Sequence, residues 1–590
     1  MAGSSSENVR RRAEKFLTDE EIEQLLNQSD VDVSDDEDTV DYFHDSSDDE
    51  TDSGDTDTEV PRSKGQEKDK RRDPLWKVKD FPARFADSPV LPEVHSNAPS
   101  SAFNYFKKYF PESFWKLCAD QTNLYSVQVR AHRSVKTTSL ELQKLAGIHM
   151  IMSLFGLPRA RLYWSSTLAV PLVTENMVRD RFFELRSMLH FVDVTAITEA
   201  QSQNKLFRAE PIFECFRKAC LELPRPEKLS IDEQMIPFSG RCPARQYVPS
   251  KPNPVGLKNF VLATTEGLVL DFVIYTGKGT VPDHDLKELG LGGAVVKRLL
   301  ETVPTEQPVQ VFTDRFFTGL KLADFLIERN IYLTGTVMSN RTGGAAAKLP
   351  SDKEMARGDS CCVVRNDDKV CITKWKDKKG VTLLSAALGI SPEGKCKRWS
   401  KEEGKKVEIP QPACVKAYNT GMGGVDLTDR YVSYYRTKIR TKKWTIRVFA
   451  HFLDLATINS WIEYRSDCKR CGVARKDTLD LFEFKSRIAE ALIRSCPKVQ
   501  ADGEEDALES DEESESAPPA RKQRKVVPLP VDEVRFDMYG HFPEHVPCKS
   551  QMRCRNPGCT GKSRIRCTKC ALFFCLQNRN CFRDFHTSKT

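Results

Sequence analysis

Four aspartates in three short motifs are the residues whose type and spacing best suit chemistry. They are Asp232 in LSIDEQMIPFSGR, Asp314 in VFTDRFF, and Asp426 with Asp429 in GGVDLTD. Asp232 and Asp314 each lie at or near the end of an apolar run typical of a strand, where burial disfavours a lone charged carboxylate. Carboxylates that converge around a divalent cation avoid this cost, because Mg²⁺ and similar ions prefer oxygen ligands. The motifs therefore predict a metal site.

The arrangement expected of these acids is that of a ribonuclease-H-like site. Such a site takes one acid from its first strand, a second from the end of a later strand and a third from a helix, and the first acid often bridges two ions about 3.5–4 Å apart. Asp426 and Asp429 are three residues apart, so a helix would place both on one face. One would ligate metal and the other would support it. The alternative is that these acids are ordinary surface charges, and that VDLTD is a helix N-cap followed by a first-turn acid.

A second group of ligand-type residues lies at the C-terminus, where seven of the 19 cysteines fall within the last 43 residues. Cys567-x-x-Cys570 has tetrahedral zinc spacing, and Cys554 with Cys559 is a permitted variant. Two zinc ions need eight ligands. The stretch from residue 554 offers seven, six cysteines and one histidine: Cys554, Cys559, Cys567, Cys570, Cys575, Cys581 and His586. His541, His545 and Cys548 stand upstream as candidates for the eighth. We predict a two-zinc domain whose folding depends on metal, because it is too small for a core of its own.

At 590 residues the chain should hold several domains. Apolar spacing of three and four predicts helices before residue 225, and from Lys228 to about Val337 short apolar runs alternate with helices as in α/β folds. The predicted fold is an α/β ribonuclease-H-like core with a small β insertion, flanked by helical DNA-binding segments, with a disordered acidic N-terminus and a cross-brace zinc domain. The expected boundaries are a disordered acidic region at 1–97, a helical dimerisation and DNA-binding segment at 98–225, the first part of the core at 226–340, an insertion at 341–412, the second part of the core at 413–435, further helices at 436–498, a charged linker at 499–534 and the cysteine-rich domain at 535–590.

Charge is distributed unevenly along the chain. Residues 30–59 contain fifteen acidic residues and no Lys or Arg, so subtracting their charge from the net +6 leaves about +21 on the rest. Such a charge suits phosphate partners, although both signs could also serve solubility alone. The N-terminus has no signal-peptide pattern, and no apolar run approaches the roughly 18 residues of a membrane span. The cluster RKQRK is typical of a nuclear localisation signal, so we expect a nuclear protein.

Basic residues flank the predicted acids, where they would hold DNA phosphates over bound metals. Trp444 follows them and could stack on bases, but its helical spacing with Val448, Phe452 and Leu455 also fits core packing. His149 and His190 lie on apolar stretches and are expected to be core histidines. The predicted DNA-binding residues are Arg241, Arg245, Lys251, Lys258, Arg315, Arg436, Lys438, Arg440, Lys442, Lys443 and Trp444, together with Arg564 and Arg566 in the C-terminal domain.

The chain resembles the piggyBac-type DNA transposases and their domesticated relatives. The stretch LSIDEQMIPFSGRCPARQYVPSKPNPVGLK resembles the block around the family's first catalytic Asp, and VFTDRFFTGLKLADFL resembles the block around the second. YNTGMGGVDLTDRYVSYYRTKIRTKKW resembles the block that holds the third and fourth acids, and TGTVMSNR and TKWKDKKGVTLLSAA match further stretches. The resemblance spans about residues 100–590.

This resemblance implies Asp232, Asp314 and Asp426 as a catalytic triad that binds two Mg²⁺, with Mn²⁺ as a substitute, and Asp429 as a fourth essential acid. It implies cut-and-paste transposition through DNA hairpins into TTAA sites, a homodimer or larger assembly, and no membrane or small-molecule partner. It also implies that the zinc domain binds transposon-end DNA, with His541 as the eighth ligand.

One departure from the family pattern is Arg315, which stands where the family commonly has Asn. An Arg there could compete with metal for Asp314 or contact phosphate. The alternative function is therefore a domesticated DNA- or chromatin-binding protein without transposition, although all four acids are retained.

Overall fold

The computed structural model describes residues 76–84, 98–129, 134–195, 197–249, 251–401, 403–494, 529–530, 532–537, 540–547, 550–577 and 579–587. Contacts divide the chain into two compact units, and each is described by itself. The predicted acidic N-terminus up to residue 75 and the predicted nuclear localisation signal lie outside the described residues. In the part of the chain that is described, no helix is long and apolar enough to cross a membrane.

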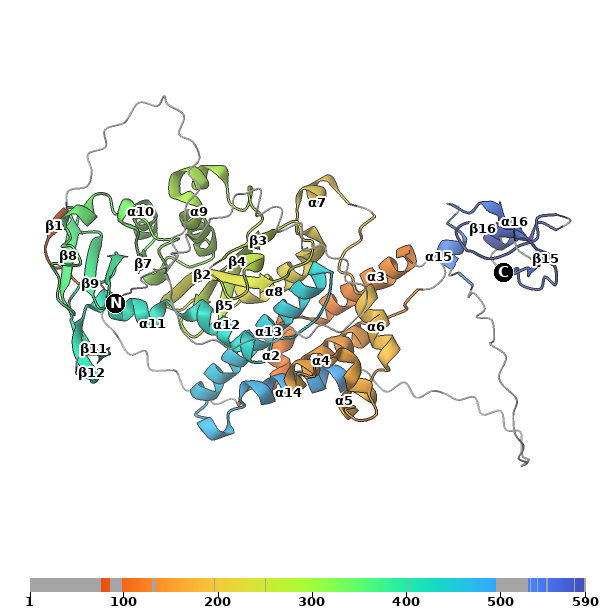
Figure 1. The fold of residues 1–590 in the computed structure, drawn as a ribbon, viewed down its shortest axis with the longest axis horizontal. Coiled ribbons are helices and arrows are strands. Elements are labelled where there is room, and N and C mark those ends of the chain that lie inside the picture. The colour runs from red at the N-terminus through yellow and green to blue at the C-terminus, as the bar shows by residue number, and fades with distance from the viewer. Residues whose placement is uncertain are drawn as a thin grey trace, which may run out of the picture. The chain divides into compact units, whose positions relative to one another are not determined.

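The first unit is built on a ten-stranded mixed sheet (Figure 1). Its strands run in the order β1-β8-β9-β10-β7-β6-β2-β4-β3, with β5 paired to β4. Their bounds are β1 Trp76–Val78, β2 Lys228–Pro237, β3 Arg245–Tyr247, β4 Val255–Thr264, β5 Val269–Ile274, β6 Val309–Thr313, β7 Ile331–Thr336, β8 Ser360–Arg365, β9 Cys371–Lys376 and β10 Gly380–Ser385.

The centre of this sheet is parallel, whereas both sides are antiparallel. β6 pairs in parallel with β2 and with β7, and every other pairing in the sheet is antiparallel. Parallel neighbours need a crossover, which α9 and α10 supply. The helices of this unit are α9 Asp283–Leu300, α10 Leu320–Ile327, α11 Ala413–Gly421 and the first half of α12 Gly424–Tyr434. The alternation of runs and helices predicted for residues 228–337 is confirmed.

The predicted small β insertion at 341–412 is only partly a separate element. β8, β9 and β10 extend the core sheet through the pairing of β10 with β7. Their apolar side chains, such as Val363, Ile372 and Leu384, are fully buried, so the strands continue the core. Only β11 Gly394–Ser400 and β12 Lys405–Gln411 form a sheet of their own.

The predicted disordered region at 1–97 is wrong at its residues 76–84. β1 pairs with β8 at the edge of the sheet, and Trp76 and Phe81 are buried there, at 2% and 0% exposure. The indole nitrogen of Trp76 donates a hydrogen bond to the carbonyl of Gly343 (2.9 Å). These two large aromatic residues help to dock the segment, together with the backbone hydrogen bond from Arg84 to Ala387 (3.0 Å).

The second unit, apart from its C-terminal region, is helical, as predicted for 98–225 and 436–498. Its apolar core includes an aromatic cluster of Phe110, Phe114, Trp115, Phe191 and Phe449. Its helices are α2 Ala102–Tyr109, α3 Glu112–Val129, α4 Ser139–Phe155, α5 Pro171–Thr174, α6 Arg179–Met188, α7 Glu199–Gln203, α8 Glu210–Leu221, most of α13 Trp444–Arg470, and α14 Leu481–Arg494.

Two histidines and one ion pair mark the interior of this unit. His149 is buried against Phe182, and His190 stacks on Tyr125 with ring centroids 3.8 Å apart. Burial lowers the pKa of His149 to about 3, so the ring is neutral. The prediction of a core histidine is confirmed for His149, whereas His190 is only half-buried. Lys485 and Asp454 form a buried ion pair at 2.8 Å, and Asp454 also accepts a hydrogen bond from the Thr437 hydroxyl (2.7 Å).

The C-terminal region contains four short strands and a terminal helix. The strands pair as two two-stranded sheets, β13 Pro543–His545 with β16 Ile565–Cys567 and β14 Met552–Arg553 with β15 Lys562–Ser563. The helices are α15 Asp532–Arg535 and α16 Cys581–Thr587. Its buried cluster consists of four cysteines, three phenylalanines and Leu572. So small an apolar core cannot sustain a fold by itself.

Candidate carboxylate and metal-binding sites

Asp232 and Asp314 lie side by side on neighbouring parallel strands. The pairing of β2 with β6 aligns Ser230 with Phe312 and Ile231 with Thr313, so the next pair in register is Asp232 with Asp314. Paired residues point to the same face, and adjacent strands are about 4.8 Å apart. Asp314 follows the last residue of β6, as predicted. Asp232 is the fifth residue of the ten-residue β2 rather than its end, but it stands where the parallel pairing with β6 stops.

Asp426 reaches the same face from the first turn of α12. The helix start is fixed by close backbone contacts with the sheet. A Cβ atom on Gly424 would lie 2.2 Å from the carbonyl oxygen of Thr264 and 2.4 Å from the Ser230 hydroxyl, so only glycine fits. The Thr428 hydroxyl donates to the carbonyl of Gly267 (2.6 Å), in the turn after β4. Since Ser230 and Asp232 are two residues apart on β2, both face α12.

The electrostatics of the site show that the three acids act on one another. Burial first, and then the negative charge of Asp314, raises the pKa of Asp232 to about 7, and the charge of Asp426 adds to the rise. Burial likewise raises the pKa of Asp314 above its usual value. Tyr418 on α11 is affected by all three carboxylates, and burial raises its pKa to about 12. The raised pKa values of Asp232 and Asp314 come first from burial, and the positive charge of Lys251 offsets them only in part.

Asp429 is held by a chain of amide side chains that the sequence did not reveal. The amide of Gln234 donates to Asp429 (2.6 Å), and the amide of Asn259 donates to Gln234 (3.3 Å). Gln234 and Asn259 are fully buried partners on β2 and β4. Asp429 is therefore a supporting acid that ties α12 to the sheet. A polar residue two positions after Asp232, on the same strand face, was the available signal.

The donor set fits hard divalent cations. Asp232, Asp314 and Asp426 offer carboxylate oxygens only, which Mg²⁺ and Mn²⁺ prefer. These three are not among the groups of described residues whose ligand atoms all lie within 4.8 Å of one another. A single ion held directly by all three acids is therefore not favoured.

The basic residues predicted to surround this site have varied placements. Lys251 and Lys258 both pair with Glu233, at 3.3 and 2.5 Å. Burial opposes ionisation of Glu233, but these two lysines hold its pKa below the usual value. Strand alternation puts Glu233, Lys258 and Phe260 on the sheet face opposite Asp232, and Lys258 also lies over the rings of Phe260 and Phe316. Lys258 is thus engaged inside the protein.

The other predicted DNA-binding residues range from exposed to buried. Arg245 donates to the carbonyls of Ser239 and Gly240 and so braces the turn after β2. Trp444 is 7% exposed, which agrees with core packing and leaves little ring surface for a base. Exposed members of the set are Arg241, Arg315, Lys438, Arg440, Lys442 and Arg564, and half-buried members are Arg436, Lys443 and Arg566.

The eight predicted zinc ligands form two groups of four. His541, Cys567, Cys570 and His586 make one group, and within each group the ligand atoms all lie within 4.8 Å of one another. The second group is Cys554, Cys559, Cys575 and Cys581. Their order along the chain interleaves, which is the crossed arrangement predicted. The donor chemistry fits zinc, because four thiolate and imidazole ligands form tetrahedral structural sites.

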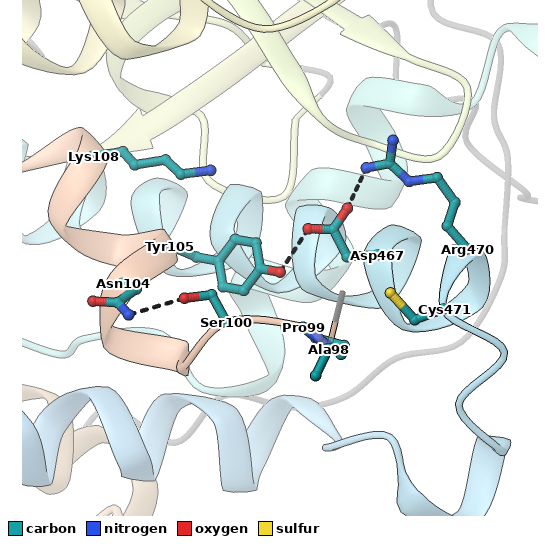
Figure 2. A pocket seen from close by; sticks show the side chains of 9 residues that line it. All are labelled: Ala98, Pro99, Ser100, Asn104, Tyr105, Lys108, Asp467, Arg470 and Cys471. Carbon is teal, nitrogen blue, oxygen red and sulfur yellow. Dashed lines mark hydrogen bonds and ion pairs between the residues drawn. The ribbon is translucent and has the colours of Figure 1, made fainter. Parts of the chain in front are cut away.

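A polar pocket of about 410 Å³ in the helical unit is separate from these groups (Figure 2). Figure 2 shows its polar side chains bonded to one another: Tyr105 donates to Asp467 (2.6 Å), Arg470 pairs with Asp467, and Asn104 donates to Ser100 (2.9 Å). None of the predicted site residues lines it. The hydrogen bond between Tyr105 and Asp467 therefore joins α2 to α13, and the pocket has no part in the predicted chemistry.

Comparison with known proteins defines the class of this fold and site. The family model described as transposase IS4 matches residues 101–461, and the chain belongs to this transposase family. Within it the chain is of the piggyBac type, which confirms the resemblance found in the sequence.

Named relatives support this placement. Human piggyBac transposable element-derived protein 2 is 27% identical over 86% of this chain and 80% of its own length. Human piggyBac transposable element-derived protein 3 is 27% identical over 80% of this chain and 74% of its own length. The fold is similar to that of a piggyBac transposase solved as a synaptic complex with hairpin DNA, with a TM-score of 0.57 and 23% identity, covering 68% of this chain and 85% of that one.

Proposed function

We propose that this protein is a cut-and-paste DNA transposase that cleaves DNA through hairpin intermediates and integrates at TTAA sites. The observation that carries the proposal is the meeting of Asp232, Asp314 and Asp426 on one face of a sheet, from segments far apart in the sequence. Membership of a transposase family supports DNA cleavage as the chemistry. The order strand, strand, helix for these acids supports a ribonuclease-H-like assignment of the core.

In this proposal Asp232, Asp314 and Asp426 hold two Mg²⁺ ions. When bound, the ions would supply charge neutralisation and an activated water for in-line displacement at phosphorus. Asp429, held by Gln234, keeps α12 and therefore Asp426 in place. The buried sheet face limits solvent around the acids and strengthens their hold on cations.

The proposed reaction sequence alternates hydrolysis with transesterification. Each attack by water breaks a phosphodiester bond and leaves a 5′-phosphate and a 3′-hydroxyl, and each attack by a 3′-hydroxyl exchanges one phosphodiester bond for another. Water attacks the transposon end and releases a 3′-hydroxyl. That hydroxyl attacks the opposite strand and closes a hairpin while freeing the flanking DNA. Water reopens the hairpin, and the regenerated 3′-hydroxyl attacks target DNA at TTAA. Positioning and charge stabilisation are the protein's contribution to each step.

The C-terminal region would hold two Zn²⁺ ions and bind the transposon terminal repeats. His541, Cys567, Cys570 and His586 would bind one ion, and the four remaining cysteines would bind the other. Basic residues available for phosphates are Arg553, Arg555, Lys562, Arg564 and Arg566. We further propose at least a homodimer, because two ends must be held together, and action in the nucleus.

An excision assay in cells with a donor bounded by matched terminal repeats tests the catalytic proposal. Wild type should excise, and Asp232→Asn, Asp314→Asn and Asp426→Asn should each reduce excision by at least a thousandfold while leaving repeat binding intact. Asp283→Asn, an exposed acid at the start of α9, is the matched control and should excise normally. Excision that survives Asp232→Asn would refute the assignment.

The second candidate is a domesticated DNA-binding protein without transposition. The names of the relatives, which describe proteins derived from a transposable element, favour it. This candidate predicts that wild type and Asp232→Asn bind the same DNA equally well and that neither excises the donor.

A further inference from the structure

A two-stranded ribbon projects from the first unit and carries residues that neither motif analysis nor the proposed chemistry uses. β11 and β12 pair antiparallel over seven residues each (Figure 1). The register places Lys395 opposite Pro410, Lys397 opposite Glu408 and Trp399 opposite Lys406. Because paired and alternate residues point to one side, these six residues form a single face. We call Lys395, Lys397, Trp399, Lys406, Glu408 and Pro410 the ribbon face.

Every residue of the ribbon face is exposed. Trp399 is 56% exposed, whereas the other described tryptophans in the sheet unit, Trp76, Trp375 and Trp444, are at most 7% exposed. Within the described part of the chain, the ammonium groups of Lys395, Lys397 and Lys406 make no ion pair within 4.0 Å. With Glu408 included, the face carries a net charge of +2 around one large uncovered aromatic ring.

The opposite side of the ribbon is fastened to the sheet, so the face is presented rigidly. Ile409 and the half-buried Cys396 and Val407 pack in a cluster with Trp375 and Leu383. Arg398 donates to Asp377 (2.9 Å), the same carboxylate that Arg357 pairs with at 2.8 Å.

A further contact fixes the ribbon at Trp399 itself. Arg357 also donates to the carbonyl of Trp399 (3.1 Å). The main chain beneath the exposed ring is therefore held in place, and little conformational entropy would be lost when the ring meets a partner.

We propose that the ribbon face binds double-stranded DNA, with Trp399 against the bases or sugars in a groove and the three lysines on flanking phosphates. The inference rests on the proposed function for the presence of DNA and adds a contact surface to it. A two-stranded ribbon fits the major groove, and seven residues of strand span about 23 Å. Protein interfaces are depleted in lysine at their centres, so unpaired lysines around the ring favour a phosphate partner over a protein.

The test measures binding of the full-length chain to a labelled 30-base-pair duplex by fluorescence anisotropy over a range of NaCl concentrations. Lys395→Gln/Lys397→Gln/Lys406→Gln should lower the slope of log affinity against log salt by about 3, because each phosphate contact contributes about 0.9. Trp399→Ala should weaken binding on the order of tenfold at one salt concentration. Glu408→Gln should strengthen binding, because it removes the only negative charge from the face.

Matched controls separate this surface from general charge. Lys353→Gln/Lys369→Gln/Lys378→Gln removes the same charge from exposed positions in the same region and should change the slope by less than 1. Trp399→Phe keeps a ring and should retain most of the affinity, but it should remove the component of tryptophan fluorescence that DNA quenches. All variants are at exposed positions, so their thermal unfolding should match that of wild type.

All binding measurements are repeated in the Asp232→Asn background, so that a failure of the catalytic proposal leaves this test readable. Equal salt slopes for the ribbon and control triple variants would overturn the proposal. So would a Trp399→Ala variant that binds DNA normally but loses self-association by mass photometry, because that result would assign the face to a second copy of the chain.

Discussion

The carboxylate site and the C-terminal Cys/His groups both gather ligand-type side chains, but they are assembled in different ways. Asp232, Asp314 and Asp426 come from segments nearly two hundred residues apart, and the sheet with α12 brings them together. The eight Cys and His residues lie within 46 residues of one another. The first group is imposed on a fold that exists without it, whereas the second supplies much of the core of its own fold.

This difference has an energetic consequence. The sheet and α12 hold the acids close together in a buried place, and this burial, followed by the negative charge of Asp314, raises the pKa of Asp232. A cation bound there would neutralise the carboxylates and so remove the free-energy cost of ionising them in the folded protein. In the C-terminal region four of the eight buried cluster members are cysteines, so a bound metal would itself be part of the core of this fold.

The largest expected effect tests the dependence of the C-terminal region on metal. Cys567→Ser/Cys570→Ser should lower the zinc content of the purified chain by one ion and unfold this region, because structural zinc contributes about 10–16 kcal/mol to folding. Mass spectrometry under native conditions gives the stoichiometry. Cys468→Ser/Cys471→Ser has the same two-residue spacing in the helical unit and should leave zinc content unchanged.

The next effect concerns the free-energy cost of ionising Asp232 in the folded protein. The pKa of Asp232, about 7, lies above its usual value near 3.9, so the folded state holds the proton more tightly than the unfolded state. Without Mg²⁺, this group therefore costs stability as pH rises from about 4 to 7, by at most about 4 kcal/mol. Asp232→Asn should unfold at a higher temperature than wild type at pH 8 in Mg²⁺-free buffer, and the two should converge near pH 4.

Added Mg²⁺ should close this gap, because it stabilises wild type and not Asp232→Asn. Calorimetric melting curves at pH 4 and pH 8 provide the measurement. A wild type that is already the more stable protein at pH 8 without Mg²⁺ would show that ionised Asp232 carries no such cost in the folded state.

A smaller effect should follow from moving one acid without removing it. Gly424→Ala would place a methyl group 2.2 Å from the carbonyl oxygen of Thr264, so α12 must shift and carry Asp426 with it. A displacement of about 1 Å should reduce excision by about a hundredfold. Zinc content should not change, and Gly423→Ala, where a Cβ meets nothing within 4 Å, is the control.

The smallest effect is expected at the residue that supports Asp429. Gln234→Leu keeps the volume of the side chain but removes its hydrogen bond to Asp429. Excision should fall about tenfold, as for other residues that orient a ligand. A fall as large as that of Asp232→Asn would instead place Gln234 in direct contact with the reacting groups.

The sequence predicted the local features of both sites and missed features that depend on pairing. The eight proposed zinc ligands could be predicted because their spacing is short, but their division into two groups required the register of β13 with β16 and of β14 with β15. The acids could be predicted from motifs, whereas the roles of Gln234 and Glu233 depend on which strand face each side chain occupies.

Two further features were not predicted correctly for the same reason. β8–β10 were expected to form a separate insertion, because no local signal shows that β10 pairs with β7 across 44 residues of chain. The ribbon of β11 and β12 lies within the β insertion expected at 341–412, but the pairing of its two lysine-rich strands was not predicted. In each case a hydrogen-bonded partner distant in sequence decided the structure.

The docking of Trp76–Val78 on β8 has a consequence for any shortened version of the chain. A sheet margin with unpaired backbone groups invites pairing with other molecules, and a short strand with charged, exposed side chains is a natural way to discourage it. Lys77 and Val78 are exposed and Trp76 is buried, so this segment covers β8 and forms a short, protected edge strand of the sheet. A truncation that starts after Arg84 would leave β8 as an unpaired edge strand six residues long. Such a protein should aggregate at concentrations where the full-length chain stays monodisperse.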